Sequence, residues 1–361
     1  MSASISRKQA FELGEQDPGT FFRDVVEPMA DSFDPAQSAR YDELMQAWGL
    51  QRSDVVPAIP ERVEVVHVLS RVTLGADIKI AGMVLNAMKR RFPEARIVFV
   101  AGRKSIGLFE ADRRLEFFEA AYPRTGPVSR RIAFGHELRA TLEGPNRIVV
   151  DPDSRMTQLG LIAPCEPDRH FHFPSRTLGD AVANLTELTA QWLQETFGVS
   201  GEAFIAPRPV ASDAEAAISL GVGENESKRV TGRFEAGLIR LVGERYRTVC
   251  VDRGVGGEES RRVTAAVEAS GIGNRVRFHE GSFAAFASIV GQSRFYAGYD
   301  SAGQHAAAAA GVPLLTVFAG APSAVFRARW EPKGPANCAV LNADGMTSDA
   351  ILQQLPRFLL A

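Results

Sequence analysis

A polar cluster between two apolar segments has the residue types and order of a phosphate-binding turn. Asp300 to His305 follow the apolar segment 294–298 and lead, through a run of alanines, into the apolar segment 314–318. This order predicts a strand, a polar turn, a helix and a second strand. The first turn of a helix has unpaired backbone N–H groups, so it can bind a phosphate once Asp300 or Ser301 serves as N-cap. The alternative is a cap with a purely structural role.

A lysine after a glycine-containing loop is the second candidate. Gly221 follows the apolar segment 217–220, and Lys228 lies seven residues further along the chain. Glycine allows the backbone to approach a ligand closely, and a lysine ammonium supplies a point charge to a diphosphate. The alternative for Lys228 is a solvated surface charge. Gly221-Val222-Gly223 alone is only a fragment of a dinucleotide fingerprint.

Carboxylates after two other expected strands are further candidates. Asp77 begins the expected helix 77–91, where the helix dipole would keep the carboxylate ionised and able to accept a proton. A helix-capping role is the alternative. Asp252 and Glu258 follow the expected strand 248–251, where a carboxylate can bind a ribose or a base, or can belong to a surface loop.

Composition and charge exclude several classes of protein. The 361 residues carry a net charge of −2, so there is no basic excess for binding nucleic acid. The three cysteines are scattered, which indicates buried thiols in a reducing compartment. No apolar run is long enough to span a membrane, and the N-terminus lacks a secretory signal, so we expect a cytoplasmic protein. Residues 71–150 have a local balance of +7 and residues 1–70 one of −6, which is consistent with either solvated faces or a basic wall for an acidic substrate.

The apolar segments alternate with helical ones in two series, which predicts two Rossmann-like α/β domains facing a cleft. An apolar stripe at helical spacing predicts that the N-terminal segment is helical as well. The expected parts are a helical N-terminal extension (1–60), a first Rossmann-like domain (61–205), a linker (206–217), a second Rossmann-like domain (218–340) and a C-terminal helix (341–361). His170 and His172 alternate along a short expected strand without a nearby carboxylate pair, so no metal site is predicted.

Four pieces of sequence, taken together and in order, resemble the heptosyltransferase-like glycosyltransferases (glycosyltransferase family 9), which have the GT-B fold. They are Arg71-Val72-Thr73-Leu74-Gly75-Ala76-Asp77, the stretch from Ile218-Ser219-Leu220-Gly221 to Ser227-Lys228-Arg229, the Asp300–His305 cluster, and Phe318-Ala319-Gly320 with Arg329-Trp330-Glu331-Pro332-Lys333-Gly334-Pro335. The resemblance covers about residues 63–340 and leaves the first sixty unexplained.

The resemblance implies a role for each matching residue. It makes Asp77 the catalytic base, although the family's Leu-Gly-Asp loop here contains an additional Ala76. It places the donor phosphates on Ser227 and Lys228. In the third piece Ala302 and Gly303 replace other residues of the family pattern, yet both retain the backbone N–H. His305 is either a ligand contact or a packed core histidine.

The resulting expectation is a metal-independent, inverting glycosyltransferase without a cofactor. Its donor would be a nucleotide-diphosphate sugar, with ADP-heptose implied by the resemblance, and its acceptor a bacterial glycan such as a lipopolysaccharide core. The alternatives are a nucleotide-sugar epimerase of GT-B type and a non-catalytic nucleotide-sugar-binding scaffold. Peripheral contact with the inner membrane face is compatible with this reading. The donor would be bound by Gly221, Ser227, Lys228, Asp252, Asp300, Ser301, Ala302, Gly303 and His305, and the acceptor by Arg71, Gly75, Arg103 and Lys104, with Arg130 and Arg131 as further acceptor-side charges.

Overall fold

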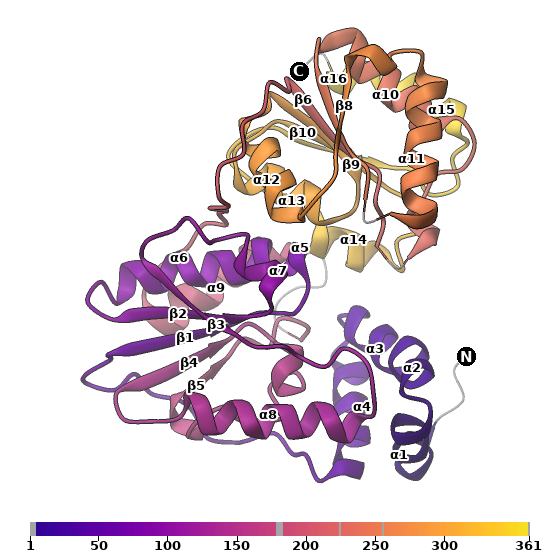
Figure 1. Cartoon of the computed structure of the whole chain (residues 1–361). Helices are drawn as coiled ribbons and strands as arrows, with labels where there is room; N and C mark the ends of the chain where they lie inside the picture. Colours follow the sequence, from indigo (N-terminus) through magenta and orange to yellow (C-terminus); the bar gives the residue numbers. More distant parts are fainter. Residues whose placement is uncertain (1–4, 178–182, 224, 255, 360–361) are drawn as a thin grey trace. The chain divides into compact units, whose positions relative to one another are not determined.

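The computed structural model describes residues 5–177, 183–223, 225–254 and 256–359, which form two compact units (Figure 1). Unit 1 comprises the described residues within Met1–Ile106, Arg113–Glu202 and Pro322–Arg329. Unit 2 comprises those within Gly107–Asp112, Ala203–Ala321 and Trp330–Ala361. Among the described residues, none of the helices combines the length and apolarity that spanning a bilayer requires.

Unit 1 is built on a five-stranded parallel sheet with the order β3-β2-β1-β4-β5. Its strands are β1 (Val65–Leu69), β2 (Arg96–Ala101), β3 (Leu115–Glu119), β4 (Arg147–Asp151) and β5 (His170–His172). Helices α6 (Gly82–Arg91) and α9 (Leu185–Phe197) lie on one face and α8 (Val128–Leu142) on the other (Figure 1). The central strand β1 is apolar except for His67, and it is buried along its whole length because both faces of the sheet are covered. Short helical turns complete the unit: α5 (Leu74–Ala76), η3 (Asp77–Ala81), α7 (Arg103–Ile106), η4 (Arg155–Thr157) and η5 (Pro167–Arg169). Helix α14 (Ala324–Trp330) contributes its residues up to Arg329.

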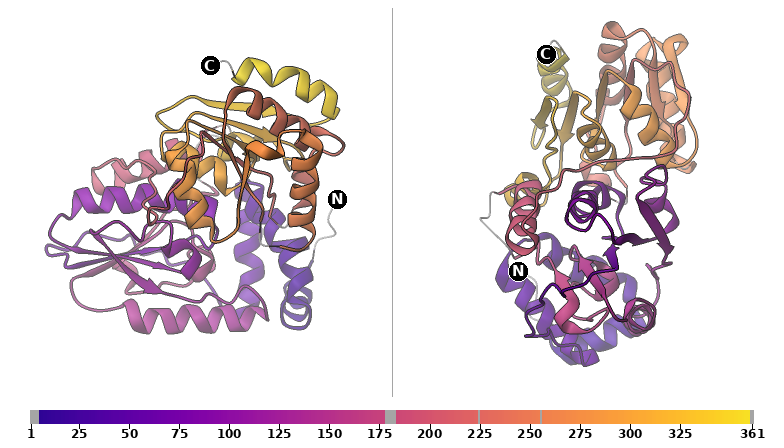
Figure 2. Two further views of the ribbon diagram at one scale, coloured as in Figure 1. Left: turned by 45° about the horizontal axis from the view of Figure 1, so that its top comes forward. Right: turned by 90° about the vertical axis from the view of Figure 1, so that its left-hand side faces the viewer.

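The N-terminal extension is helical and belongs to unit 1. Its elements are α1 (Arg7–Gln16), α2 (Pro18–Phe21), η1 (Phe22–Val26), α3 (Glu27–Asp31), α4 (Pro35–Met45) and η2 (Gln46–Trp48). They lie beside the sheet and α8 (Figures 1 and 2). Phe21, Leu44 and Met45 share an apolar cluster with Val128 of α8 and with Ile162. The apolar stripe seen in the sequence is therefore core packing.

Unit 2 has a six-stranded parallel sheet with the order β11-β10-β9-β6-β7-β8. Its strands are β6 (Ala216–Ser219), β7 (Val249–Asp252), β8 (Val276–His279), β9 (Phe295–Tyr299), β10 (Leu314–Phe318) and β11 (Cys338–Asn342). One face packs against α10 (Phe234–Arg245), α11 (Gly257–Ser270), α15 (Ser348–Gln354) and α16 (Pro356–Leu359). The other packs against α12 (Phe283–Gln292) and α13 (Ala302–Ala309). The short turns η6 (Glu226–Lys228) and η7 (Gly273–Arg275) connect these elements.

Several boundaries differ from those expected. The expected linker 206–217 ends inside β6, and the segment 341–361 begins inside β11 and then forms two short helices, α15 and α16. Residues 107–112 lie between two segments of unit 1 but belong to unit 2. Residues 322–329 lie between two segments of unit 2 but belong to unit 1. Cys165 and Cys250 are buried as expected, whereas Cys338 is half-buried.

Candidate functional site

The expected donor residues gather at one point of the sheet in unit 2. Strands β6 and β9 are neighbours, but β6 continues to β7 on one side and β9 to β10 on the other. Ligands of open α/β sheets bind beyond the carboxyl ends of the strands at such a switch point. Gly221 follows β6 and Asp300 follows β9, so the fold brings these two pieces of sequence together.

Lys228 and Asp300 form an ion pair at the switch point. Lys228 Nζ is 2.6 Å from Asp300 Oδ2, and the side chains are 18% and 8% exposed. The second carboxylate oxygen of Asp300 accepts a hydrogen bond from Gln304 Nε2 at 2.5 Å. Lys228 is thus mostly buried beside the turn, and not a solvated surface charge.

The N-terminus of α13 lies next to this pair. Ser301 is at the N-cap, yet within the described chain its side chain makes no capping hydrogen bond. Ser301 Oγ and Tyr296 Oη are both buried, and Tyr296 faces the hydroxyl groups of Ser301 and Ser219. A Cβ at Gly303 would lie 2.1 Å from Tyr296 Oη, so this position requires glycine. In the described chain, the backbone N–H groups in the first turn of α13 donate no hydrogen bond to a capping side chain, so they can bind an anion.

Two glycines hold the Lys228 loop in place. Gly320, at the end of β10, has a φ of +60° and its Cβ position lies 2.2 Å from the carbonyl oxygen of Ser227. Ser227 donates from its N–H and its Oγ to Asn225 Oδ1, at 3.0 and 2.6 Å. On the other side of the loop, the Cβ position of Gly221 lies 2.6 Å from Glu259 Oε1. Glycine is therefore needed at Gly320, where the close atoms belong to the backbone, whereas at Gly221 the close atom is the mobile end of the Glu259 side chain.

The carboxylates near β7 differ in part from those expected. Asp252 ends β7 and accepts a 3.3 Å hydrogen bond from the N–H of Gly254, and burial raises its pKa. Glu258 is exposed, whereas the neighbouring Glu259 is half-buried against Gly221, with a pKa raised by burial. Glu259, and not Glu258, is therefore the half-buried carboxylate beside Gly221.

His305 is buried inside α13, one turn from its start, with its ring centroid 5.9 Å from that of Trp330. This matches the packed core histidine that the sequence allowed. Ala302 and Gly303 are the first two residues of α13, so their N–H groups belong to its first turn.

In unit 1, Asp77 lies at the corresponding switch point, where β1 is flanked by β2 and β4. Its side chain is fully buried. Oδ2 accepts hydrogen bonds from Ser70 Oγ at 2.7 Å and Ser105 Oγ at 2.6 Å, and Oδ1 accepts one from the Arg71 N–H at 2.6 Å. Burial outweighs these hydrogen bonds and raises the pKa of Asp77 to about 6. A carboxyl with this pKa is ionised at neutral pH and is still basic enough to accept a proton.

The additional Ala76 lies in the helix itself. Ala76 ends the short α5, and residues Asp77–Ala81 form a π-helical turn before α6 begins. A π-turn contains one more residue than an α-turn, so it accommodates an extra residue without shifting the register of the helix that follows. The loop before it is strained, because the β-branched Val72 has a φ of 72°.

A polar network that the sequence reasoning missed connects Asp77 with the end of β4. Arg71, whose N–H binds Asp77, donates from Nη1 to Ser175 Oγ at 2.7 Å. Ser175 Oγ donates to Asp153 Oδ2 at 2.7 Å, and Arg176 Nη1 lies 2.7 Å from the same oxygen. Burial alone would raise the pKa of Asp153, but Arg176, His172 and Arg71 together hold it well below its ordinary value.

The two histidines of β5 each have a carboxylate partner, contrary to the expectation of none. His170 Nε2 is 3.2 Å from Asp151 Oδ2, and His172 Nε2 is 3.3 Å from Asp153 Oδ1. Both pairs are nineteen residues apart, and they join positions 170 and 172 of β5 to the end of β4 and to the loop that follows it. In the part of the chain that the structure describes, no group of three or more His, Cys, Asp or Glu residues could bind a metal ion.

The expected acceptor residues are only partly brought together. Gly75 is half-buried in α5. Arg103 and Lys104 are exposed on α7, whose next residue, Ser105, binds Asp77. Arg131 is buried with its guanidinium 3.3 Å from the ring centroid of Phe22, whereas Arg130 is exposed. The local basic excess therefore includes residues that serve packing.

Comparisons with known proteins identify the fold. The sequence matches no protein-family model, and no curated protein matches it at a significant level. Among solved structures, a glycosyl transferase family 9 protein from Veillonella parvula has a TM-score of 0.60, with 15% identity over 83% of this chain and 98% of that chain. E. coli heptosyltransferase WaaC with ADP has a TM-score of 0.60, with 15% identity over 81% and 99%. E. coli ADP-heptose lps heptosyltransferase II has a TM-score of 0.55, with 17% identity over 82% and 99%.

The fold is that of the family 9 glycosyltransferase structures. This confirms the expected architecture of two Rossmann-like parts with a helical extension. The three matches cover nearly all of the known chains but leave 17–19% of this chain unmatched. Residues 1–60 make up a similar share of the 361 residues.

Proposed function

We propose that this protein is a glycosyltransferase that moves a sugar from a nucleotide-diphosphate sugar to a hydroxyl group of a glycan acceptor. The observation that carries the proposal is the meeting of Lys228 and the uncapped N-terminus of α13 at the switch point of unit 2. An ammonium group and backbone N–H groups stabilise the charge that develops on a departing diphosphate. The likeness to structures of sugar transferases supports the same assignment.

The residues divide between the two substrates. In unit 2, Lys228 and the N–H groups of Ala302 and Gly303 bind the donor diphosphate, and Asp252 or Glu259 binds the ribose. In unit 1, Asp77 is the general base. The acceptor oxygen attacks the anomeric carbon, the bond from that carbon to the diphosphate oxygen breaks, and the electron pair leaves with the diphosphate. The proton of the acceptor hydroxyl passes to Asp77, and the anomeric centre is inverted.

Asp77 accepts hydrogen bonds from two serine hydroxyls and one N–H, and these bonds fix the orientation of its carboxylate, as a general base requires. The hydroxyls of Ser70 and Ser105 rotate about single bonds, so each can donate a hydrogen bond to the ionised carboxylate and can accept one from the carboxyl once Asp77 has taken up the proton. Lys228 and the helix N-terminus supply the charge that a metal ion supplies in other transferases, so we propose that turnover needs no divalent cation.

The test is calorimetric binding of ADP, UDP, GDP and CMP and of their sugar conjugates, with magnesium and with EDTA. We expect one nucleoside diphosphate to bind in EDTA, and Lys228→Met to weaken it at least tenfold. Binding that requires magnesium would contradict metal independence, and the absence of binding by any nucleotide would overturn the donor site.

Product analysis separates the proposal from its alternatives. An epimerase would convert the nucleotide sugar without an acceptor. A non-catalytic scaffold would bind it and leave both the sugar and the acceptor unchanged. For the transferase we expect nucleotide release that depends on acceptor and that is lost in Asp77→Asn, while the affinity for the donor is retained.

A further inference from the structure

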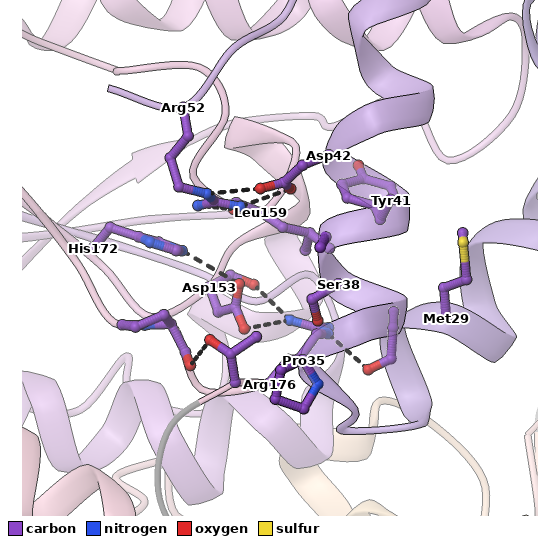
Figure 3. Close-up of a pocket in the computed structure, with 14 residues that line it drawn as sticks. Met29, Pro35, Ser38, Tyr41, Asp42, Arg52, Asp153, Leu159, His172 and Arg176 are labelled. Carbon is purple, nitrogen blue, oxygen red and sulfur yellow. Dashed lines mark hydrogen bonds and ion pairs between the residues drawn. The ribbon is translucent and has the colours of Figure 1, made fainter. Parts of the chain in front are cut away.

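A pocket of about 370 Å³ opens within unit 1, between the N-terminal extension and the carboxyl ends of β4 and β5. Figure 3 shows it. Its walls come from α3, α4 and the segment after η2 on one side, and from the loops after β4 and β5 on the other. The volume is within the range of small-ligand sites, and its place at the carboxyl ends of the strands is where α/β sheets bind ligands. No residue of this pocket was singled out as a binding residue from the sequence.

The polar side chains that line the pocket are held in place by ion pairs and hydrogen bonds. Asp153 and Arg176 are 3% and 9% exposed, and they form an ion pair. Figure 3 shows the Arg176 guanidinium between Asp153 and α3, where its Nε donates to the carbonyl oxygen of Ala30 at 3.0 Å. At the other side, Arg52 binds Asp42 through two hydrogen bonds of 3.0 and 2.8 Å. His172 completes the polar lining through its contact with Asp153.

The balance of charges indicates the class of ligand. The lining has two guanidinium groups and two carboxylates, so a strong anion would face Asp42 and Asp153 and a cation would face the arginines. An apolar ligand would remove water from these ion pairs and would offer no hydrogen bonds in place of those to water, which is unfavourable. A hydroxyl group suits both signs, because it donates to a carboxylate and accepts from a guanidinium. Between the charged groups, apolar surface is available to the C–H faces of a ring: Met29, Pro35, Tyr41, Leu159 and Pro174.

We infer that this pocket binds an uncharged, hydroxyl-rich saccharide. Its role as the site for the acceptor glycan rests on the proposed function. The pocket is connected to the proposed base, because Asp153 binds Ser175, Ser175 binds Arg71, and the Arg71 N–H binds Asp77. Asp153 itself has a φ of 69°, so the loop that carries it is held in a strained conformation at this point.

The N-terminal extension therefore has a function besides packing. It supplies one wall of the pocket. The three compared structures leave 17–19% of this chain unmatched, a share similar to that of the extension. The acceptor preference of this chain would accordingly depend on residues 29–52, a region that the resemblance to the family does not explain.

The experiment uses the full chain and saturation-transfer NMR with maltose, cellobiose, mannobiose and chitobiose, with glucose 1-phosphate as an anionic comparator and ADP as a reporter of unit 2. Ser38→Trp fills the pocket from α4 without removing an ion pair, and Gln37→Trp places the same side chain at the adjacent, exposed position outside the pocket. Ala39→Phe, at an exposed position that also lines the pocket, replaces Ser38→Trp if that variant melts at a lower temperature than the parent.

We expect at least one neutral disaccharide to bind, with affinity reduced tenfold or more in Ser38→Trp and changed less than twofold in Gln37→Trp. No binding by any disaccharide, binding that Ser38→Trp leaves intact, or binding by glucose 1-phosphate alone would overturn the inference. Because nucleotide binding is measured on the same samples, with the nucleoside diphosphate that binds in calorimetry replacing ADP where the two differ, the two proposals fail separately. Nucleotide binding without disaccharide binding overturns only the pocket. Disaccharide binding without binding of any of the nucleotides supports the pocket as a saccharide site and overturns its role in sugar transfer.

Discussion

Replacing the two members of the Lys228–Asp300 pair should change the affinity for ADP in opposite directions. Lys228→Met removes the ammonium and keeps a side chain of similar length, whereas Asp300→Asn keeps the shape and removes the negative charge. If Lys228 binds the diphosphate, Asp300 competes with the phosphates for the same ammonium, because its Oδ2 is 2.6 Å from Lys228 Nζ. ADP lacks the transferred sugar, so contacts of Asp300 with that sugar do not enter the measurement.

The size of the effect follows from the geometry. A phosphate oxygen on the same ammonium would lie roughly 5 Å from the Asp300 carboxylate, and two unit charges at that distance repel by about 3 kcal/mol at an effective dielectric constant of ~20. The Lys228 side chain is 18% exposed, so water screens part of this repulsion. We expect roughly half of it, which corresponds to about tenfold tighter binding of ADP by Asp300→Asn. Lys228→Met should bind ADP at least tenfold more weakly. It should also unfold more easily, by up to about 3 kcal/mol, because a buried carboxylate loses its counter-ion.

The assay is isothermal titration calorimetry with ADP at two salt concentrations, with the free energy of unfolding measured in urea for each variant. The matched control is Asp349→Asn, which removes a carboxylate from the exposed ion pair with Arg233 in the same unit. It should leave the affinity within twofold. If Asp300→Asn weakens ADP binding together with Lys228→Met, the pair is a structural support and the electrostatic argument for the donor site is wrong.

Three further predictions concern Gly320 beside the Lys228 loop, the proposed base Asp77, and Arg176 of the pocket. Gly320→Ala should lower stability by about 1–3 kcal/mol and weaken ADP binding, because the new Cβ would lie 2.2 Å from the Ser227 carbonyl at a φ of +60°; thermal unfolding and calorimetry measure both, and an unchanged ADP affinity would contradict it. Asp77→Asn should reduce transfer at least ~100-fold. The rate of the parent enzyme should fall below pH 6, since the pKa of Asp77 is raised to about 6. The pKa of Asp77 is higher in the folded than in the unfolded protein, so between pH 6 and pH 4 the folded protein binds more protons than the unfolded one. Protonation of Asp77 therefore increases the free energy of unfolding as the pH falls through this range, while it lowers the rate. A pH–rate profile of the parent, and urea unfolding of the parent and of Asp77→Asn at several pH values, test these two opposite changes. Arg176→Met should cost about 3–5 kcal/mol, because Asp153 is left charged and buried; a second substitution, Asp153→Asn, should recover part of that loss in urea unfolding, and no recovery would mean that the cost is one of packing.

The α/β alternation was predictable because the central strands are covered on both faces. Val65–Leu69 and Leu314–Phe318 are therefore apolar except for one residue each, His67 and Thr316, and they stand out in the sequence. The edge strands β3 and β11 are partly exposed, so they do not appear as apolar runs in the sequence. Leu115–Glu119 includes two glutamates and is mostly exposed, and Cys338–Asn342 is mostly half-buried, so neither strand is predicted from the sequence.

For the site, the local sequence indicates single candidate residues but not the pairs that they form in the fold. Lys228 and Asp300 were each chosen because they follow a strand, yet their pairing joins residues 72 positions apart and only the fold shows it. Asp153 also follows a strand closely, so the rule that selected Asp77 and Asp300 would have found it as well. The pocket itself could not be found in this way, because Arg176 and Ala30 are 146 positions apart and nothing local connects them.

The exchange of two short segments between the units has a consequence for synthesis on the ribosome. Unit 1 contains residues 322–329, and Phe326 from that segment packs against Phe33, with ring centroids 6.4 Å apart. Domains that end early in the chain can fold while the remainder is still being translated. Unit 1 is complete only once residues 322–329 have been made, and these follow residues 203–321 of unit 2 in the chain. Until then Phe33 of the nascent protein lacks its contact with Phe326. For the same reason no single cut in the chain separates the two units.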